Sequence, residues 1–170
     1  MIRTILHYPD KRLRTKGEHV PEVTAAVRQL VSDMAETMYA APGVGLAATQ
    51  IGVALQLFIV DVAAEDEPSD LRVFINPEIL DRRDTVSWSE GCLSFPGVSE
   101  EVERAAQVSV RAQDQDGRWF ELEAEGLLAV AIQHEFDHLQ GVLMIDHLGT
   151  LKKRLVNRKM QRRPGAGVEA

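Results

Sequence analysis

The chain has little of several features that mark specialised classes of protein. It contains one cysteine, and aromatic residues make up 5% of its 170 residues. One cysteine cannot form an intramolecular disulfide, so it is a small buried residue, a reactive thiol or a metal ligand. Residues 1–10 hold no sustained apolar run, which argues against a signal peptide or membrane span there. We therefore expect a cytoplasmic protein with no membrane partner.

Basic residues are outnumbered by acidic ones, and the formal net charge is -7. Domains that bind nucleic acid through their whole surface usually carry a basic excess that neutralises phosphates, so we expect no specific DNA partner. The apolar fraction of 45% and charged fraction of 26% are typical of a globular protein. The length predicts a single folded domain over residues 1–163. The small and polar residues 164–170 predict a disordered tail.

Hydrophobic periodicity divides the chain into helices and strands. Apolar residues three and four apart predict a helix that begins just after Pro21 and stops at Pro42-Gly43, and another over 127–139 that Gly141 ends. A basic helix is predicted over 151–163. Short β-branched runs predict strands and a hairpin, with an acidic loop at 63–70. The strands lie at 55–62, at 73–75 (ended by Asn76-Pro77), and in the hairpin arms at 108–110 and 119–122.

These elements predict an α+β fold in which antiparallel β-sheets pack around a central helix, with a second helix at the C-terminal end. The central helix carries His134-Glu135-Phe136-Asp137-His138, an H-E-x-x-H pattern. The spacing places both imidazoles on one face, about 5–6 Å apart at Cβ, so that they can share one metal ion. Glu135 lies beside that face and can reach a metal-bound water. A chance match is the alternative, which the predicted helix disfavours.

A catalytic metal needs a third protein ligand. The better-known peptidase patterns are incomplete here, because Met144 stands at the final histidine position and no glutamate follows until Glu169. Asp146 and His147 are candidates, although surface or capping roles suit them equally well. We prefer Cys92, whose small neighbours allow the backbone to approach an ion closely.

Three separated segments together resemble the bacterial type of the peptide deformylase family. They are Gly-Val-Gly-Leu-Ala-Ala-Thr-Gln at 43–50, Glu-Gly-Cys-Leu-Ser at 90–94, and Gln-His-Glu-Phe-Asp-His-Leu-Gln-Gly at 133–141, in the order of the family. The resemblance implies a hydrolase that removes the formyl group from the N-terminal formylmethionine of newly synthesised proteins and releases formate. The implied partner is a nascent formylated polypeptide.

The same resemblance implies that Cys92, His134 and His138 bind one divalent metal ion. Fe(II) is the expected native ion, with Zn(II) or other divalent ions as replacements. Glu135 is the implied general base and then acid: it deprotonates a metal-bound water that attacks the formyl carbonyl, and it protonates the departing amine.

Two groups are implied to stabilise the oxyanion, namely the side chain of Gln50 and the backbone N–H of Leu93. Without the resemblance, Gln50 would be interpreted as an exposed turn residue. Gly45 either permits a turn or lets a substrate backbone lie against the protein as an added strand. Val44, on the same loop, is expected to line the methionine pocket.

Two rival functions remain at this point. An ordinary metallopeptidase would use Asp146 or His147 as its third ligand. A non-catalytic, metal-stabilised binding module on the ribosome would tolerate the loss of Glu135. The basic helix over 151–163 has seven Lys and Arg residues and no acid, so it is either a solvated face or a surface that docks on ribosomal RNA.

Overall fold

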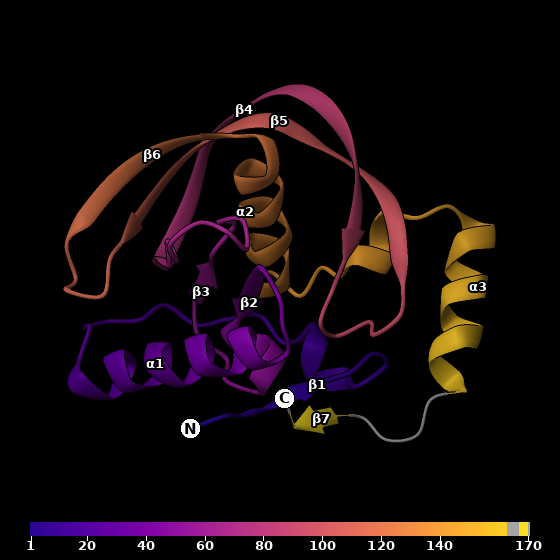
Figure 1. The fold of residues 1–170 in the computed structure, drawn as a ribbon, viewed down its shortest axis with the longest axis horizontal. Helices are drawn as coiled ribbons and strands as arrows, with labels where there is room; N and C mark the ends of the chain where they lie inside the picture. The colour runs from indigo at the N-terminus through magenta and orange to yellow at the C-terminus, as the bar shows by residue number, and fades with distance from the viewer. Residues whose placement is uncertain (163–166, 170) are drawn as a thin grey trace.

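A curved antiparallel sheet arches over one central helix (Figure 1). The computed structural model describes residues 1–162 and 167–169. The sheet has the strand order β2-β3-β4-β5-β6, and the helix beneath it is α2, Gly126–Leu139, which carries H-E-x-x-H. The predicted α+β fold is therefore confirmed. The strands are β2 (Gly45–Ala47), β3 (Leu57–Val60), β4 (Arg72–Gly91), β5 (Ser99–Gln113) and β6 (Trp119–Glu125).

The prediction that Asn76-Pro77 ends a strand is wrong. Strand β4 continues through these residues to Gly91, and the pairing with β5 shifts in register between Ile75 and Glu78. Asn76 takes a positive φ of 51°, and its side-chain amide exchanges two 2.8 Å hydrogen bonds with the backbone of Val20. A bulge of this kind admits a proline without ending the strand. The predicted hairpin is present, and its arms extend into β5 and β6.

The first long helix, α1 (Ala25–Ala40), begins four residues after Pro21 and not directly after it, as the periodicity predicted. The Thr24 side chain accepts a hydrogen bond from the Val27 N–H, which caps the helix at that point. Helix α2 ends before Gly141, as predicted. Gly141 has a φ of +75°, and a Cβ there would lie 2.6 Å from the Arg14 carbonyl oxygen, so this position requires glycine.

The remaining elements flank this central unit. They are β1 (Thr4–Leu6), α3 (Thr150–Gln161), β7 (Gly167–Glu169) and the short 3-10 helices η1 (Lys11–Arg14), η2 (Ala48–Ile51) and η3 (Met144–His147). Strand β7 pairs with β1. The disordered tail expected over 164–170 stays a prediction, and residues 164–166 and 170 lie outside the described residues. No helix among the described residues is both long and apolar enough to cross a bilayer.

Three apolar clusters fix α2 and the segment after β4 relative to each other. One joins α2 to the sheet through residues such as Phe58, Phe74 and Ile132. A second lies between α1 and strands β2 and β3. The third packs Phe95 against η3 and α3, next to Cys92. Because burial of apolar surface is the main stabilising contribution to folding, these clusters hold the candidate site residues in place.

Candidate metal centre

Cys92, His134 and His138 come together at one point between α2 and the segment that follows β4. One ligand atom from each residue lies within 4.8 Å of the ligand atoms of the other two. The Cys92 Sγ is 3.4 Å from His138 Nε2, and the two imidazole centroids are 5.1 Å apart. The three residues expected to bind a metal, which stand 46 positions apart at the extremes, are thus brought to one place.

The donors at this point suit a divalent metal ion. Zn–S and Zn–N bonds are about 2.3 Å and about 2.0–2.1 Å long, so donors that share an ion lie a few ångströms apart, as they do here. Thiolate and imidazole together suit zinc and ferrous iron. Beside them the Glu135 Oε1 is buried and has no hydrogen-bond partner within the described part of the chain. A buried polar atom without a partner is unfavourable unless a bound group satisfies it.

The two histidines experience opposite electrostatic effects. Burial and the neighbouring His134 lower the pKa of His138 well below its usual value, so its imidazole is neutral and can donate a lone pair. Burial also opposes the charged form of His134, but the Cys92 sulfur and the Glu135 carboxylate outweigh it and raise its pKa. The pocket around His134 therefore favours positive charge, whether it is a proton or a metal cation.

A buried ion pair supports His134 from behind. The Glu90 Oε1 lies 2.9 Å from His134 Nδ1, and Arg104 donates to both Glu90 oxygens, each at 2.9 Å. Burial alone would raise the pKa of Glu90, but hydrogen bonds from Arg104 and His134 lower it to about 2. The carboxylate is therefore ionised and accepts the Nδ1–H, which turns His134 Nε2 toward the other ligands.

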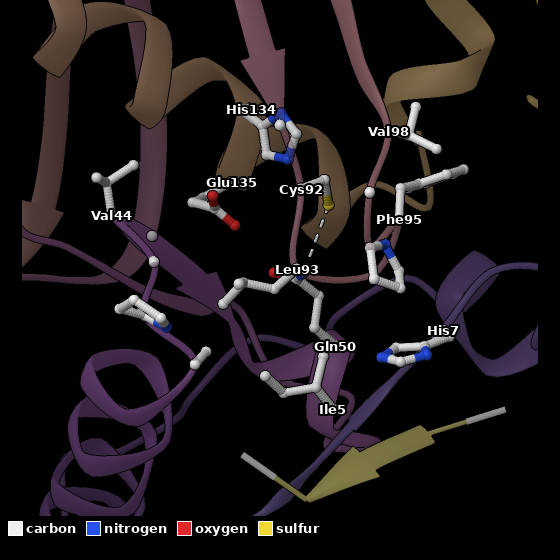
Figure 2. Close-up of a pocket in the computed structure, with 17 residues that line it drawn as sticks. Ile5, His7, Val44, Gln50, Cys92, Leu93, Phe95, Val98, His134 and Glu135 are labelled. Carbon is white, nitrogen blue, oxygen red and sulfur yellow. Dashed lines mark hydrogen bonds between the residues drawn. The ribbon is translucent and has the colours of Figure 1, made fainter. Parts of the chain in front are cut away.

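Glu135 lies on the open side of the three ligands, where Figure 2 shows its carboxylate directed into the cavity. Its side chain is buried, and burial raises its pKa to about 7. Gly45 makes room for it, because a Cβ on Gly45 would lie 2.5 Å from Glu135 Oε2. A carboxyl group with a pKa near neutrality can both accept and donate a proton at physiological pH.

Gln50 presents its amide group to the same place. Its Oε1 accepts a hydrogen bond from the Ala47 N–H at 2.9 Å, which leaves the NH₂ group directed toward Ser94 Oγ at 3.0 Å and Cys92 Sγ at 3.7 Å. The side chain is 1% exposed, so Gln50 is not the solvent-exposed turn residue of the alternative interpretation. The backbone N–H of Leu93 donates no hydrogen bond within the described residues.

Two adjoining cavities meet at Val44, His134 and Glu135. The larger one is about 570 Å³ and extends from Val44 past Cys92 and Leu93 to His7 (Figure 2). The smaller one is about 150 Å³ and is lined partly by apolar side chains, namely those of Val44, Trp88, Leu127, Val130 and Ala131. A ligand that occupies both cavities would have its centre beside Glu135.

The other candidates for the third ligand lie elsewhere. Asp146 accepts a hydrogen bond from the Leu143 N–H at 2.9 Å and pairs with Arg14, which is a capping role. His147 Nε2 lies 2.8 Å from Asp137 Oδ2.

Sequence reasoning missed the pair formed by Glu90 and Arg104. Glu90 stands in the segment that contains Cys92, so its place in that segment was a usable signal, whereas nothing in the sequence indicated Arg104.

Comparison with known proteins identifies the family. The sequence model of the family described as polypeptide deformylase matches residues 2–154. A peptide deformylase of Polynucleobacter necessarius is 49% identical over 161 residues, which are 94% of this chain and 93% of that protein. The crystal structure of a peptide deformylase from Legionella pneumophila superposes with a TM-score of 0.90 at 42% identity and covers 96% of this chain and 100% of that one. The crystal structure of a peptide deformylase from Ehrlichia chaffeensis in complex with actinonin superposes with a TM-score of 0.91 at 36% identity. It covers 96% of this chain and 98% of that one. The chain therefore belongs to the polypeptide deformylase family of enzymes.

Proposed function

We propose that the chain hydrolyses the formyl amide of polypeptides that begin with formylmethionine, so that water and the amide yield formate and a free α-amine. The observation that carries this proposal is the buried Glu135 Oε1, which has no hydrogen-bond partner among the described residues and lies beside three convergent metal-ligand candidates. The similarity to peptide deformylases over nearly the whole chain supports the same reaction.

In this proposal Cys92, His134 and His138 hold one divalent ion. When bound, such an ion polarises the formyl oxygen and lowers the pKa of a water molecule. We favour Fe(II), because a thiolate ligand donates charge to the metal and iron tolerates added coordination, with Zn(II) as a replacement. Metal analysis after anaerobic purification, with activity per bound ion, tests this preference. Inactive iron-loaded enzyme beside active zinc-loaded enzyme would refute it.

Glu135 moves the proton in the proposed reaction. Burial raises its pKa to about 7, so the carboxylate can take a proton from the attacking water and then deliver it to the departing amine nitrogen. Gly45 lies against the carboxylate and leaves no space for water between them. The proton therefore stays beside the reacting atoms.

Gln50 and Leu93 stabilise the negative charge that develops on the formyl oxygen. The Ala47 N–H fixes the orientation of the Gln50 amide, so its NH₂ group is directed at the centre before substrate arrives. The Leu93 N–H is a second donor on the segment that carries Cys92. Donors that are oriented in advance need no reorganisation during the reaction.

The first side chain of the substrate enters the smaller cavity in this proposal. Methionine has a flexible, unbranched side chain that fills irregular apolar spaces, and Val44 and Trp88 are among the walls of this cavity. Strand β2 is an edge strand of the sheet, and Gly45 within it has no side chain to obstruct a peptide backbone. The nascent polypeptide can therefore add along β2 as an extended strand.

The decisive experiment measures formate release from a formyl-methionyl tripeptide by the metal-loaded full chain. We expect one formate for each free amine, no cleavage of the downstream peptide bonds, and inhibition by actinonin, with which the Ehrlichia chaffeensis enzyme was crystallised. Cys92→Ser should lower metal content, and Glu135→Gln should retain metal but lose turnover. Release of internal fragments without formate would indicate a peptidase instead.

The rival functions have less support. The metallopeptidase needs Asp146 or His147 near the histidine pair, but these residues contact Arg14 and Asp137. A non-catalytic binding module gives no reason for Glu135 Oε1 to be buried with no hydrogen-bond partner in the described part of the protein.

We also infer that the protein is cytoplasmic. We further infer that α3 contacts the ribosome, from which formylated chains emerge. Most of its cations are exposed, although Lys152 lies 3.5 Å from Glu100. Val156 and Met160 are buried in the third cluster, so deleting the helix would expose the core. Triple charge reversal at Lys153, Arg154 and Arg158 is the better test. Unchanged co-sedimentation with ribosomes at low salt would refute this contact.

A further inference from the structure

A series of polar contacts leads from the metal-ligand candidate His134 to the protein surface beside η3. Glu90 and Arg104 form its buried part, and Arg104 Nη1 then donates to Asp137 Oδ2 at 2.6 Å. His147 Nε2 lies 2.8 Å from the same oxygen. Side-chain exposure rises along this series of contacts toward the surface, from 4% at Glu90 and Arg104 to 18% at Asp137 and 31% at His147.

The contacts connect four separate elements. Glu90 belongs to β4, Arg104 to β5, Asp137 to α2 and His147 to η3. Glu90 stands two residues before Cys92, so the segment that carries the sulfur is tied through Arg104 to the helix that carries both imidazoles. The spacing between sulfur and imidazoles therefore depends on where the guanidinium lies.

Asp137 is the second acidic residue that holds the guanidinium, beside Glu90. Arg104 uses Nε and Nη2 on Glu90 and directs Nη1 at Asp137. Without the Asp137 carboxylate a donor of a buried cation would lose its charged partner, which favours movement of the guanidinium toward other acceptors or solvent. Such movement would release the Glu90 oxygen that accepts the His134 Nδ1–H.

His147 restrains Asp137 at the solvent end. A groove of about 330 Å³, lined by Arg82, Thr85 and Glu103 among others, opens beside it. Arg82 lines the same groove as the Asp137 side chain. The His147 ring occupies one side of that carboxylate and keeps Oδ2 directed at Arg104.

We propose that Asp137 and His147 are positioning residues for the metal centre, which act through Arg104 and Glu90 on the orientation of His134. They touch no substrate or metal themselves. This proposal rests on the metal site of the proposed function, but it does not depend on which peptide is hydrolysed.

The test measures binding of Co(II) to the full chain, by titration and by visible absorption, together with kcat and KM for the formyl peptide. Loss of a group behind a metal-binding histidine typically costs about 10–100-fold in metal affinity or activity. We expect Asp137→Asn to weaken Co(II) affinity by that amount, to shift the absorption bands and to lower kcat with little change in KM. His147→Ala should have a smaller effect in the same direction. His147→Gln, which restores a side-chain N–H, should recover most of it.

Asp146→Asn is the matched control. Asp146 lies on the same short helix, η3, as His147, but it stabilises this helix through its contacts with Leu143 and Arg14. This variant should lower the thermal midpoint and leave Co(II) affinity and absorption unchanged. Wild-type affinity and absorption in both Asp137→Asn and His147→Ala would overturn the proposal. Equal changes in Asp146→Asn would also overturn it, because general loosening of η3 would then explain them. Absence of formate release would count against the proposed function alone, since Co(II) binding needs no peptide.

Discussion

Gly45→Ala tests the role of Glu135 without replacing a charged residue. Gly45 lies in β2 and does not have a positive φ, so alanine meets no backbone strain there. Its Cβ would, however, lie 2.5 Å from Glu135 Oε2, 2.9 Å from Cδ and 3.0 Å from Cγ. Favourable contact between carbon atoms requires about 3.5–4.0 Å, so the carboxylate must withdraw by about 1 Å.

A displacement of this size costs about 100-fold in rate when it affects a reacting group, which corresponds to about 2.7 kcal/mol of barrier. We therefore expect kcat for formate release to fall about 100-fold in Gly45→Ala, with metal content unchanged. Gly149→Ala is the control, because a Cβ at Gly149 meets no atom within 4 Å. It should behave as the wild type.

A double-mutant cycle decides whether the effect passes through Glu135. In the Glu135→Gln background, Gly45→Ala should cost little more, because the group that it displaces no longer carries a proton. If the two losses were additive, the alanine would act on substrate binding or on β2 itself. That result, or normal turnover in the single variant, would refute the reasoning.

Three further predictions concern Gln50, Trp88 and Asp33. Gln50→Leu should keep its metal and lose about 100–1000-fold in kcat, as removal of one oxyanion donor does elsewhere; normal turnover would remove Gln50 from the mechanism. Trp88→Ala should enlarge the smaller cavity and raise kcat/KM for formyl-Phe relative to formyl-Met peptides, and an unchanged ratio would place the first side chain elsewhere. Hydrogen bonds from the Met1 ammonium and from Arg3 lower the pKa of Asp33 below its usual 3.8. Asp33 therefore stabilises the fold above that pH and loses this contribution as pH falls through the lowered value, so the deficit of Asp33→Asn in urea unfolding should be larger at pH 6 than at pH 3.

Local patterns predicted the elements whose conformation is decided locally. The period of the apolar residues in α2 and the position of Gly141 located the central helix to within one residue at its start. The continuation of β4 beyond Pro77 was not predictable in this way, because it depends on the bulge at Asn76 and on the amide contacts with Val20. Those contacts join residues 56 positions apart, and no local signal describes them.

The residues of the site also differ in whether a local sequence pattern could predict them. H-E-x-x-H indicated two ligands from helix geometry alone, and Cys92 was preferred by elimination and by family resemblance. Arg104 had no such signal, since an arginine in a strand is usually a solvent-facing residue, and nothing in the sequence linked Asp137 or His147 to the support of His134. Their importance depends on burial and on the crossing of β5 over α2, which only the tertiary structure defines.

Two glutamates contact the surroundings of His134, and the structure explains why they would differ in role. Glu90 accepts hydrogen bonds from His134 and Arg104, which lower its pKa to about 2. Glu135 is buried, its Oε1 has no hydrogen-bond partner within residues 1–162 and 167–169, and burial raises its pKa to about 7. Environments that separate the pKa values of two neighbouring acids divide their tasks. Glu90 can therefore only orient the imidazole, whereas Glu135 can exchange a proton with a reacting group. An exchange of these roles would require Arg104 to pair with Glu135, whereas its guanidinium donates to Glu90 and to Asp137.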